Sequence, residues 1–184
     1  MAKCSDAWWQ PITQNFNPRL MLPPLRGLVV HITDGHGGLL SVWNDFNRIE
    51  KRASAHFCID KEGDMWQFVD TEDRAWAVDG DTQDSHWVSV ENVAKLGERL
   101  TDGQVIGCAI LLRWLHELYD VPFQRARHAN ELGLGYHHMF GIGDHICPGF
   151  PVRLQLERIV REAWYMWWRD TGDESTPLYI RSYH

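Results

Sequence analysis

The sequence lacks any long apolar run. No stretch of about 18 consecutive apolar residues occurs, so no transmembrane helix is expected. The N-terminus reads Met-Ala-Lys-Cys-Ser-Asp-Ala-Trp-Trp and has no apolar core, so we also expect no Sec signal peptide. If the substrate lies outside the cytoplasm, the protein would be made in the cytoplasm and would need another route to its target.

Cysteine is scarce, and positive charge is in deficit. Four cysteines are few for a disulfide scaffold, and Cys58 and Cys108 lie in apolar runs, where a small buried thiol is common. We therefore expect reduced thiols, apart from any bond to a metal. The 18 Lys and Arg residues against 25 Asp and Glu residues give a formal net charge of -7, which argues against a general nucleic-acid binder.

Repeats, low-complexity tracts and linkers that would divide the sequence are also missing. The length of 184 residues, with 44% apolar and 23% charged residues, is typical of one globular domain. We divide the sequence into an N-terminal arm at 1–27, which is rich in proline, a main domain at 28–169, and a polar C-terminal tail at 170–184.

The main domain alternates between strand and helix patterns, which predicts the α/β class. Thr101 is a plausible N-cap of the longest helix. The predicted elements are a buried strand at 28–33, a helix at 39–52, a β-hairpin at 54–69 that turns at Gly63, a strand at 87–93, a helix at 101–119 and a helix at 152–169.

The stretch from Gly135 to Gly149 carries His137, His138, His145 and Cys147 in a glycine-rich context. Glycine permits tight turns, and the proline that follows Cys147 cannot continue a helix, so we expect a loop that places side chains. Imidazole and thiolate are preferred zinc ligands. Two ligands from this loop would need a third protein ligand, with one position left open for catalysis.

His31 is a candidate for the third ligand, because it lies at the C-terminal end of the first predicted strand, where α/β proteins place their sites. A lone histidine there is more often a hydrogen-bonded core residue, but the loop at 137–147 favours the ligand role. His56 is expected to be structural or in a cleft wall. His36, flanked by glycines, is expected at the rim.

Glu91 is a candidate general base. On the strand at 87–93 it shares a face with Trp87 and Ser89, and a carboxylate beside a metal suits that role. A solvent-facing glutamate is the alternative from this segment alone. Arg74 and Trp76 form a pair that could hold a polar, partly apolar substrate, although packing alone also explains Trp76.

The ordered set of these features resembles the zinc-dependent N-acetylmuramoyl-L-alanine amidases. This family includes phage lysozyme-type amidases, AmpD-like amidases and peptidoglycan recognition proteins. The features are the strand with His31, the Ser-Ala-His-Phe hairpin, the Arg-Ala-Trp loop, the strand with Glu91, a long helix, and His followed by Cys-Pro-Gly. The resemblance runs from about 27 to 168 and implies one α/β domain with a central mixed β-sheet flanked by helices.

The resemblance implies that His31, His137 and Cys147 bind Zn²⁺. His138 is the rival of His137, which we prefer because the family's ligand directly follows a short strand, here Gly135-Tyr136.

Two further positions complete the implied site. The phage lysozyme branch uses a hairpin tyrosine where Ala55 stands, so Glu91 should carry the catalytic role. His145 stands where catalytic members often carry lysine. It would stabilise developing negative charge, or it would be a bystander beside the metal.

The function implied by the resemblance is hydrolysis of the amide between N-acetylmuramic acid and L-Ala in peptidoglycan. The alternatives are a module that binds muropeptide without cutting it, and an amidase that cuts within the stem peptide. A phage endolysin, a type VI secretion effector with a cognate immunity protein, and a cytoplasmic recycling amidase all fit a sequence without a signal peptide.

Overall fold

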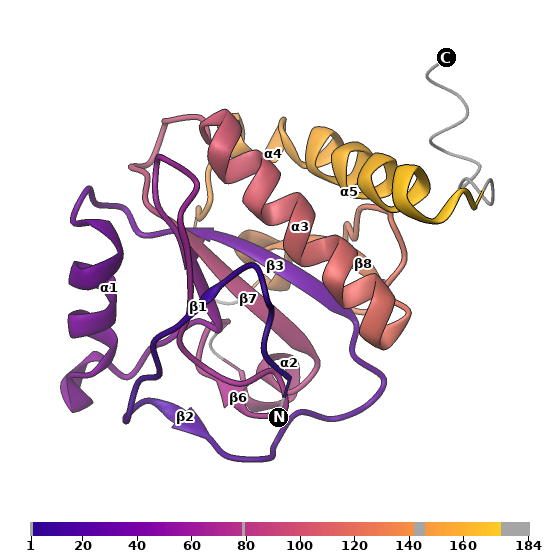
Figure 1. Ribbon diagram of the computed structural model, residues 1–184. Coiled ribbons are helices and arrows are strands. Elements are labelled where there is room, and N and C mark those ends of the chain that lie inside the picture. The colour runs from indigo at the N-terminus through magenta and orange to yellow at the C-terminus, as the bar shows by residue number, and fades with distance from the viewer. Residues whose placement is uncertain (1, 79, 142–145, 174–184) are drawn as a thin grey trace.

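A computed structural model describes residues 2–78, 80–141 and 146–173 (Figure 1). Its central sheet contains neighbouring strands in the order β1 (Trp8–Trp9), β5 (Met65–Gln67), β4 (Phe57–Ile59), β7 (Trp87–Asn92), β3 (Gly27–Ile32) and β8 (Gly133–Tyr136). Among the described strand pairs of this sheet, the β4–β5 hairpin is antiparallel and the others are parallel. The fold is therefore α/β with a mixed sheet, as the sequence predicts.

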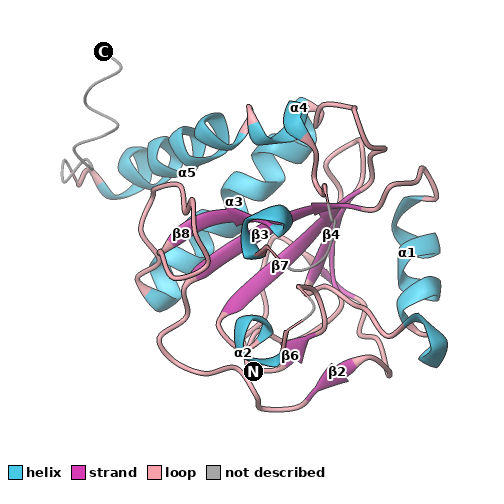
Figure 2. Cartoon of the chain, turned by 180° about the vertical axis from the view of Figure 1, so that it is seen from behind, coloured by secondary structure: helices cyan, strands magenta, loops and turns pink. Residues whose placement is uncertain are grey.

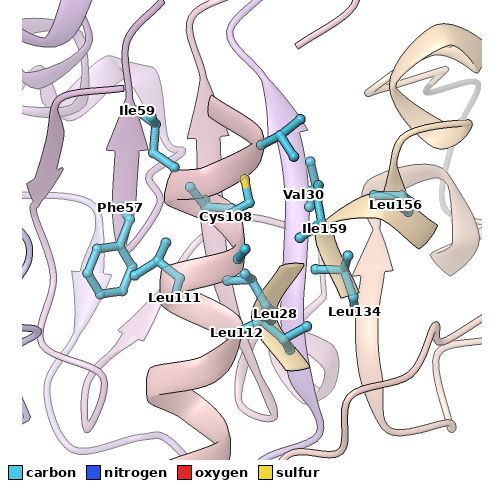
Figure 3. Close-up of a cluster of buried hydrophobic side chains, with 14 of the residues drawn as sticks. Leu28, Val30, Phe57, Ile59, Cys108, Leu111, Leu112, Leu134, Leu156 and Ile159 are labelled. Atoms are coloured by element: carbon cyan, nitrogen blue, oxygen red, sulfur yellow. The ribbon is translucent and has the colours of Figure 1, made fainter. Parts of the chain in front are cut away.

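Two long helices, α3 (Asp102–Tyr119) and α5 (Leu156–Thr171), lie side by side over one face of the sheet (Figure 1). Alternation along the strands supplies the apolar surface beneath them, since Leu28 and Val30 of β3 belong to the main core cluster. Figure 3 shows α3 side chains of this core between two strands: Cys108, Leu111 and Leu112 lie between Phe57 and Ile59 of β4 and Leu28 and Val30 of β3.

The start of α3 follows the sequence prediction. The Thr101 side chain accepts a hydrogen bond from the backbone N–H of Gln104 at 3.2 Å, and the Gln104 side chain accepts one from the backbone N–H of Thr101 at 3.0 Å. This reciprocal capping box satisfies two backbone donors that the helix itself leaves unpaired.

Two predicted helices are interrupted. The helix predicted at 39–52 is α1 (Gly38–Phe46) followed by the short 3₁₀ helix η1 (Ile49–Lys51). Asn47 ends α1, because its side chain donates to the Trp43 carbonyl oxygen and accepts from the Thr13 backbone N–H.

The helix predicted at 152–169 is α4 (Phe150–Arg153) followed by α5. Gln155 lies at the break between them. Its side chain exchanges two hydrogen bonds with the Leu100 backbone, with distances of 2.8 and 2.9 Å.

The proline-rich arm at 1–27 contains two short strands. It adds β1 to the sheet edge, and β2 (Phe16–Asn17) pairs antiparallel with β6 (Arg74–Ala75). Figure 2 shows β2, β6 and α2 (Asp81–Asp84) at the opposite end of the molecule from α5. All four cysteines are free thiols. Of the helices that the structure describes, none has the length and apolar character needed to cross a membrane.

Candidate metal centre

Three side chains from distant parts of the chain meet at one edge of the sheet. His31 lies near the carboxyl end of β3, His137 directly follows β8 at the start of η2 (His137–Phe140), and Cys147 lies in the loop before α4. Because β3 and β8 are parallel neighbours, their carboxyl ends lie at the same edge. One potential ligand atom from each side chain lies within 4.8 Å of the other two.

The loop that carries Cys147 is tied to β3. The Ile32 backbone N–H donates to the Cys147 Sγ at 3.4 Å, and this Sγ lies 4.0 Å from the His31 Nδ1. Burial, with a smaller contribution from the negative charge of Glu91, raises the pKa of the Cys147 thiol to about 12. A nearby cation would therefore be needed to stabilise the thiolate form at neutral pH.

The structure separates His137 from His138. The His137 ring lies 4.6 Å from the His31 ring, measured between centroids. His138 is exposed and instead lines a different cavity, of about 340 Å³, together with Leu96 and Phe150. Its backbone N–H donates to the Cys147 carbonyl oxygen at 2.9 Å, which fixes the direction of the loop.

Glu91 lies beside the three side chains. In the parallel register between β3 and β7 it is directly opposite His31, and its side chain lines the same cleft. Glu91 is partly buried, and its Oε2 accepts no hydrogen bond from the residues that the structure describes. Burial raises the pKa of Glu91 to about 7, although the positive charge of Lys51 opposes this shift.

The cleft has a volume of about 390 Å³, and its walls include residues that the sequence did not single out. Lys51 lines it from η1, with its ammonium group 2.6 Å from the Asp45 Oδ2. Ser54 also lines the cleft and donates through its Oγ to the Asn15 carbonyl oxygen at 2.6 Å. The sequence pattern places Lys51 inside the helix predicted at 39–52, because nothing in it shows that the helix ends at Phe46.

The two predicted substrate-binding residues occupy different positions. Trp76 lines the cleft, whereas Arg74 is absent from the described cleft wall. Arg74 instead donates to the Asn17 Oδ1 through its Nε at 3.2 Å and its Nη2 at 2.8 Å, and the Trp76 indole N–H donates to the same oxygen. Asn17 in β2 thus positions both side chains. It precedes Arg74 by 57 residues and Trp76 by 59 residues, so the local sequence does not signal these contacts. His145, the predicted charge stabiliser, lies outside the described residues.

Comparison with known proteins identifies the family. The family model described as N-acetylmuramoyl-L-alanine amidase matches residues 21–150. The chain belongs to this amidase family. A search of curated protein sequences returns no match for the amidase.

Solved structures share the fold of this amidase. An AmpD derivative superposes with a TM-score of 0.67 at 19% identity, covering 86% of this chain and 96% of that one. The endolysin LysCS from Clostridium intestinale gives a TM-score of 0.61 at 15% identity, and the superposition covers 87% of this chain and 96% of that one. The Drosophila peptidoglycan recognition protein SD gives a TM-score of 0.60 at 14% identity, and the superposition covers 79% of this chain and 87% of that one. At these identities the likeness describes the fold alone.

The donor set of the amidase fits a zinc ion. Two imidazoles and a thiol are the nitrogen and sulfur ligands that zinc prefers, whereas magnesium and calcium prefer oxygen ligands. Three protein ligands match the number used in catalytic zinc sites, which keep a fourth position open. The adjoining cleft provides space on the side where Glu91 lies.

Proposed function

We propose that this amidase is a zinc hydrolase that cleaves the amide bond between the lactyl group of N-acetylmuramic acid and L-Ala of the peptidoglycan stem peptide. The observation that carries the proposal is the convergence of His31, His137 and Cys147 beside Glu91 in the wall of one cleft. Membership of the amidase family supports the substrate class.

Each of the clustered side chains has a distinct part in the proposed reaction. His31, His137 and Cys147 hold the zinc ion, which when bound supplies Lewis acidity that polarises a carbonyl group and lowers the pKa of water. Glu91 accepts a proton from the water that attacks the amide carbon. It then delivers that proton to the departing nitrogen of L-Ala as the carbon–nitrogen bond breaks. A pKa near 7 suits a group that must both accept and release a proton.

The cleft wall supplies the remaining contacts in this proposal. Trp76 offers an aromatic surface to the sugar or peptide, and its indole is held in place by Asn17. Lys51 adds a positive charge on the same wall. Arg74 contributes through the Asn17 anchor that it shares with Trp76. Stabilisation of developing negative charge by His145 stays a prediction.

A second candidate function is recognition of muropeptide without cleavage. The fold shared with the Drosophila recognition protein supports it. The presence of Cys147 and Glu91 together favours the enzyme, because binding alone needs neither a third metal ligand nor a partly buried base. The third candidate is an amidase that cuts within the stem peptide, and it would use the same zinc and glutamate with a different bond placed in the cleft.

Mass spectrometry of products from purified sacculi separates the three candidates. The proposed reaction adds one water and releases peptides that begin with a free L-Ala amine, leaving muramic acid with a free lactyl carboxylate. Peptides that begin at a later residue would instead identify cleavage within the stem. Sacculi that bind the zinc-loaded protein but yield no new products would identify a recognition module.

We further propose that the protein acts on the cell wall as a secreted antibacterial effector or a phage endolysin. The endolysin fold of LysCS is compatible with this role. An effector would require an immunity protein in the producing cell, whereas an endolysin would not. A recycling amidase in the cytoplasm is the alternative, and it would act on soluble muropeptides in preference to intact sacculi.

A further inference from the structure

A second cavity, of about 490 Å³, adjoins the cleft at the candidate metal centre, which we name the metal cleft. The two share Trp76. One wall comes from the N-terminal arm at 13–16, and the other comes from Ile49 and Arg52 around η1. The arm segment precedes residues 21–150, the part that matches the amidase family. This cavity, which we name the arm cavity, therefore depends on a segment outside the family match.

The arm wall is fixed in place by buried and partly buried hydrogen bonds. The Asn15 side-chain Nδ2 donates to the carbonyl oxygens of Phe46 and Arg48, at 2.8 Å in each case. The Asn15 carbonyl oxygen accepts from the Ser54 Oγ, and the Trp76 backbone N–H donates to that same Oγ at 3.0 Å. These hydrogen bonds thus connect the arm wall to the end of α1 and to Ser54 in the wall of the metal cleft.

Asn15 also has a buried acceptor without a hydrogen-bond donor among the described residues. The residue is 5% exposed and lines the arm cavity, and its Oδ1 accepts no hydrogen bond from the described residues. Its two Nδ2 bonds fix the orientation of the amide. A buried acceptor without a donor is costly, so Asn15 is held here by its two Nδ2 bonds and by the packing of the arm.

Arg52 gives the arm cavity its charge. It is exposed and forms no ion pair with the residues that the structure describes, in contrast to Lys51, which is paired with Asp45. Arg52 adopts the left-handed conformation, with a φ of 49°, at the end of η1. Two consecutive cations thereby line two cavities on either side of Trp76, in a protein with a formal net charge of -7.

We propose that the arm cavity binds the carboxylate-bearing C-terminal part of the peptide whose N-terminal amide lies at the metal cleft. Arg52 pairs with a carboxylate, and Phe16 and Trp76 contact the aliphatic parts. This inference rests on the proposed function, since it extends the same substrate across Trp76. The arm thus selects for anionic stem peptides.

The test compares two synthetic N-acetylmuramoyl peptides, one with free carboxylates and one with each carboxylate converted to a carboxamide. Their dissociation constants are measured by calorimetry on zinc-loaded full-length protein that carries Glu91→Gln to prevent cleavage. We expect the carboxylate form to bind about fivefold more tightly, which is the strength of a favourable exposed ion pair. Adding Arg52→Gln should abolish this preference, and Arg52→Lys should keep most of it.

Arg48→Gln is the matched control, because Arg48 is a neighbouring exposed arginine whose side chain pairs with Asp45 and is absent from the described walls of both cavities. It should keep the fivefold preference. A preference that survives Arg52→Gln, or that Arg48→Gln removes equally, overturns the inference. Cleavage of both peptides by the wild type would then leave the proposed function intact, whereas a wild type that neither binds nor cleaves them would overturn both.

Discussion

His31 and Glu91 lie directly opposite each other on the parallel strands β3 and β7. Neighbouring strands are about 4.8 Å apart, and residues in register point to the same face, so the imidazole and the carboxylate are side by side. Both residues belong to central strands of the sheet. The proposed base and one proposed metal ligand are therefore both placed by interior strands of the sheet.

Replacing Glu91 by glutamine should remove most activity while leaving the metal bound. The amide keeps the size of the side chain but cannot accept the proton of the attacking water, so we expect the rate to fall about 10²- to 10⁴-fold. Release of soluble muropeptides from sacculi measures the rate, and zinc content measures the metal. The melting temperature should not fall, because the substitution removes a partly buried carboxylate with an unpaired oxygen.

Glu98→Gln provides the control for loss of one negative charge. Glu98 is paired with His36 and Lys61 and is absent from the described wall of the metal cleft. We expect its rate to stay near that of the wild type. Near-normal release of muropeptides by Glu91→Gln would show that another group removes the proton.

The sequence predicts the parts of the site that follow from strand ends. A buried apolar run identifies the strand that carries His31. Alternation places Glu91 on the face opposite Val88 and Val90, which belong to the main core cluster, whereas Trp87 belongs to a separate cluster. The Cys-Pro-Gly loop is identified by residue type alone. These features are local, and the parallel sheet then brings their ends together.

Other parts depend on contacts between distant residues. The end of α1 is decided by the contact of Asn47 with Thr13, and Lys51 reaches the cleft only because that helix stops. The Asn17 side chain that holds Arg74 and Trp76 comes from the arm. No local periodicity encodes such pairs, because each depends on how the arm packs against the domain.

The choice between His137 and His138 gives a second prediction. His137→Ala should lower zinc affinity more than about a hundredfold, since it removes a proposed ligand and not merely a supporting contact. His138→Ala should retain wild-type affinity, because His138 lies in a different cavity. Competition with a chromophoric chelator measures the affinity, and circular dichroism shows whether each variant is folded.

The two variants form a matched pair, since both remove an imidazole from the same short helix. The prediction concerns binding and not catalysis, so it can be checked without a substrate. Loss of zinc from His138→Ala together with its retention in His137→Ala would reverse the ligand assignment.

His56 gives a third prediction, which concerns stability and pH. It is fully buried, its Nδ1 accepts from the Ser89 backbone N–H at 3.1 Å, and its Nε2 donates to the Asp73 carbonyl oxygen at 3.1 Å. Burial lowers the pKa of His56 to about 4, against an ordinary value of 6.5, although the Asp73 carbonyl opposes this shift. The folded protein therefore resists protonation that the unfolded chain accepts, because burial disfavours the charged imidazolium.

Stability from neutral His56 is complete above pH 6.5 and is lost as the pH falls toward 4. The loss in free energy of unfolding should reach about 3 kcal/mol. Urea titrations of zinc-free protein between pH 4 and pH 7 measure it, and His56→Gln should show a flatter profile over this interval, because glutamine does not titrate. If that variant does not fold, the imidazole nitrogen shifts of wild-type His56 provide the same test. A His56 that becomes protonated near pH 6.5 while the protein stays folded would contradict the prediction.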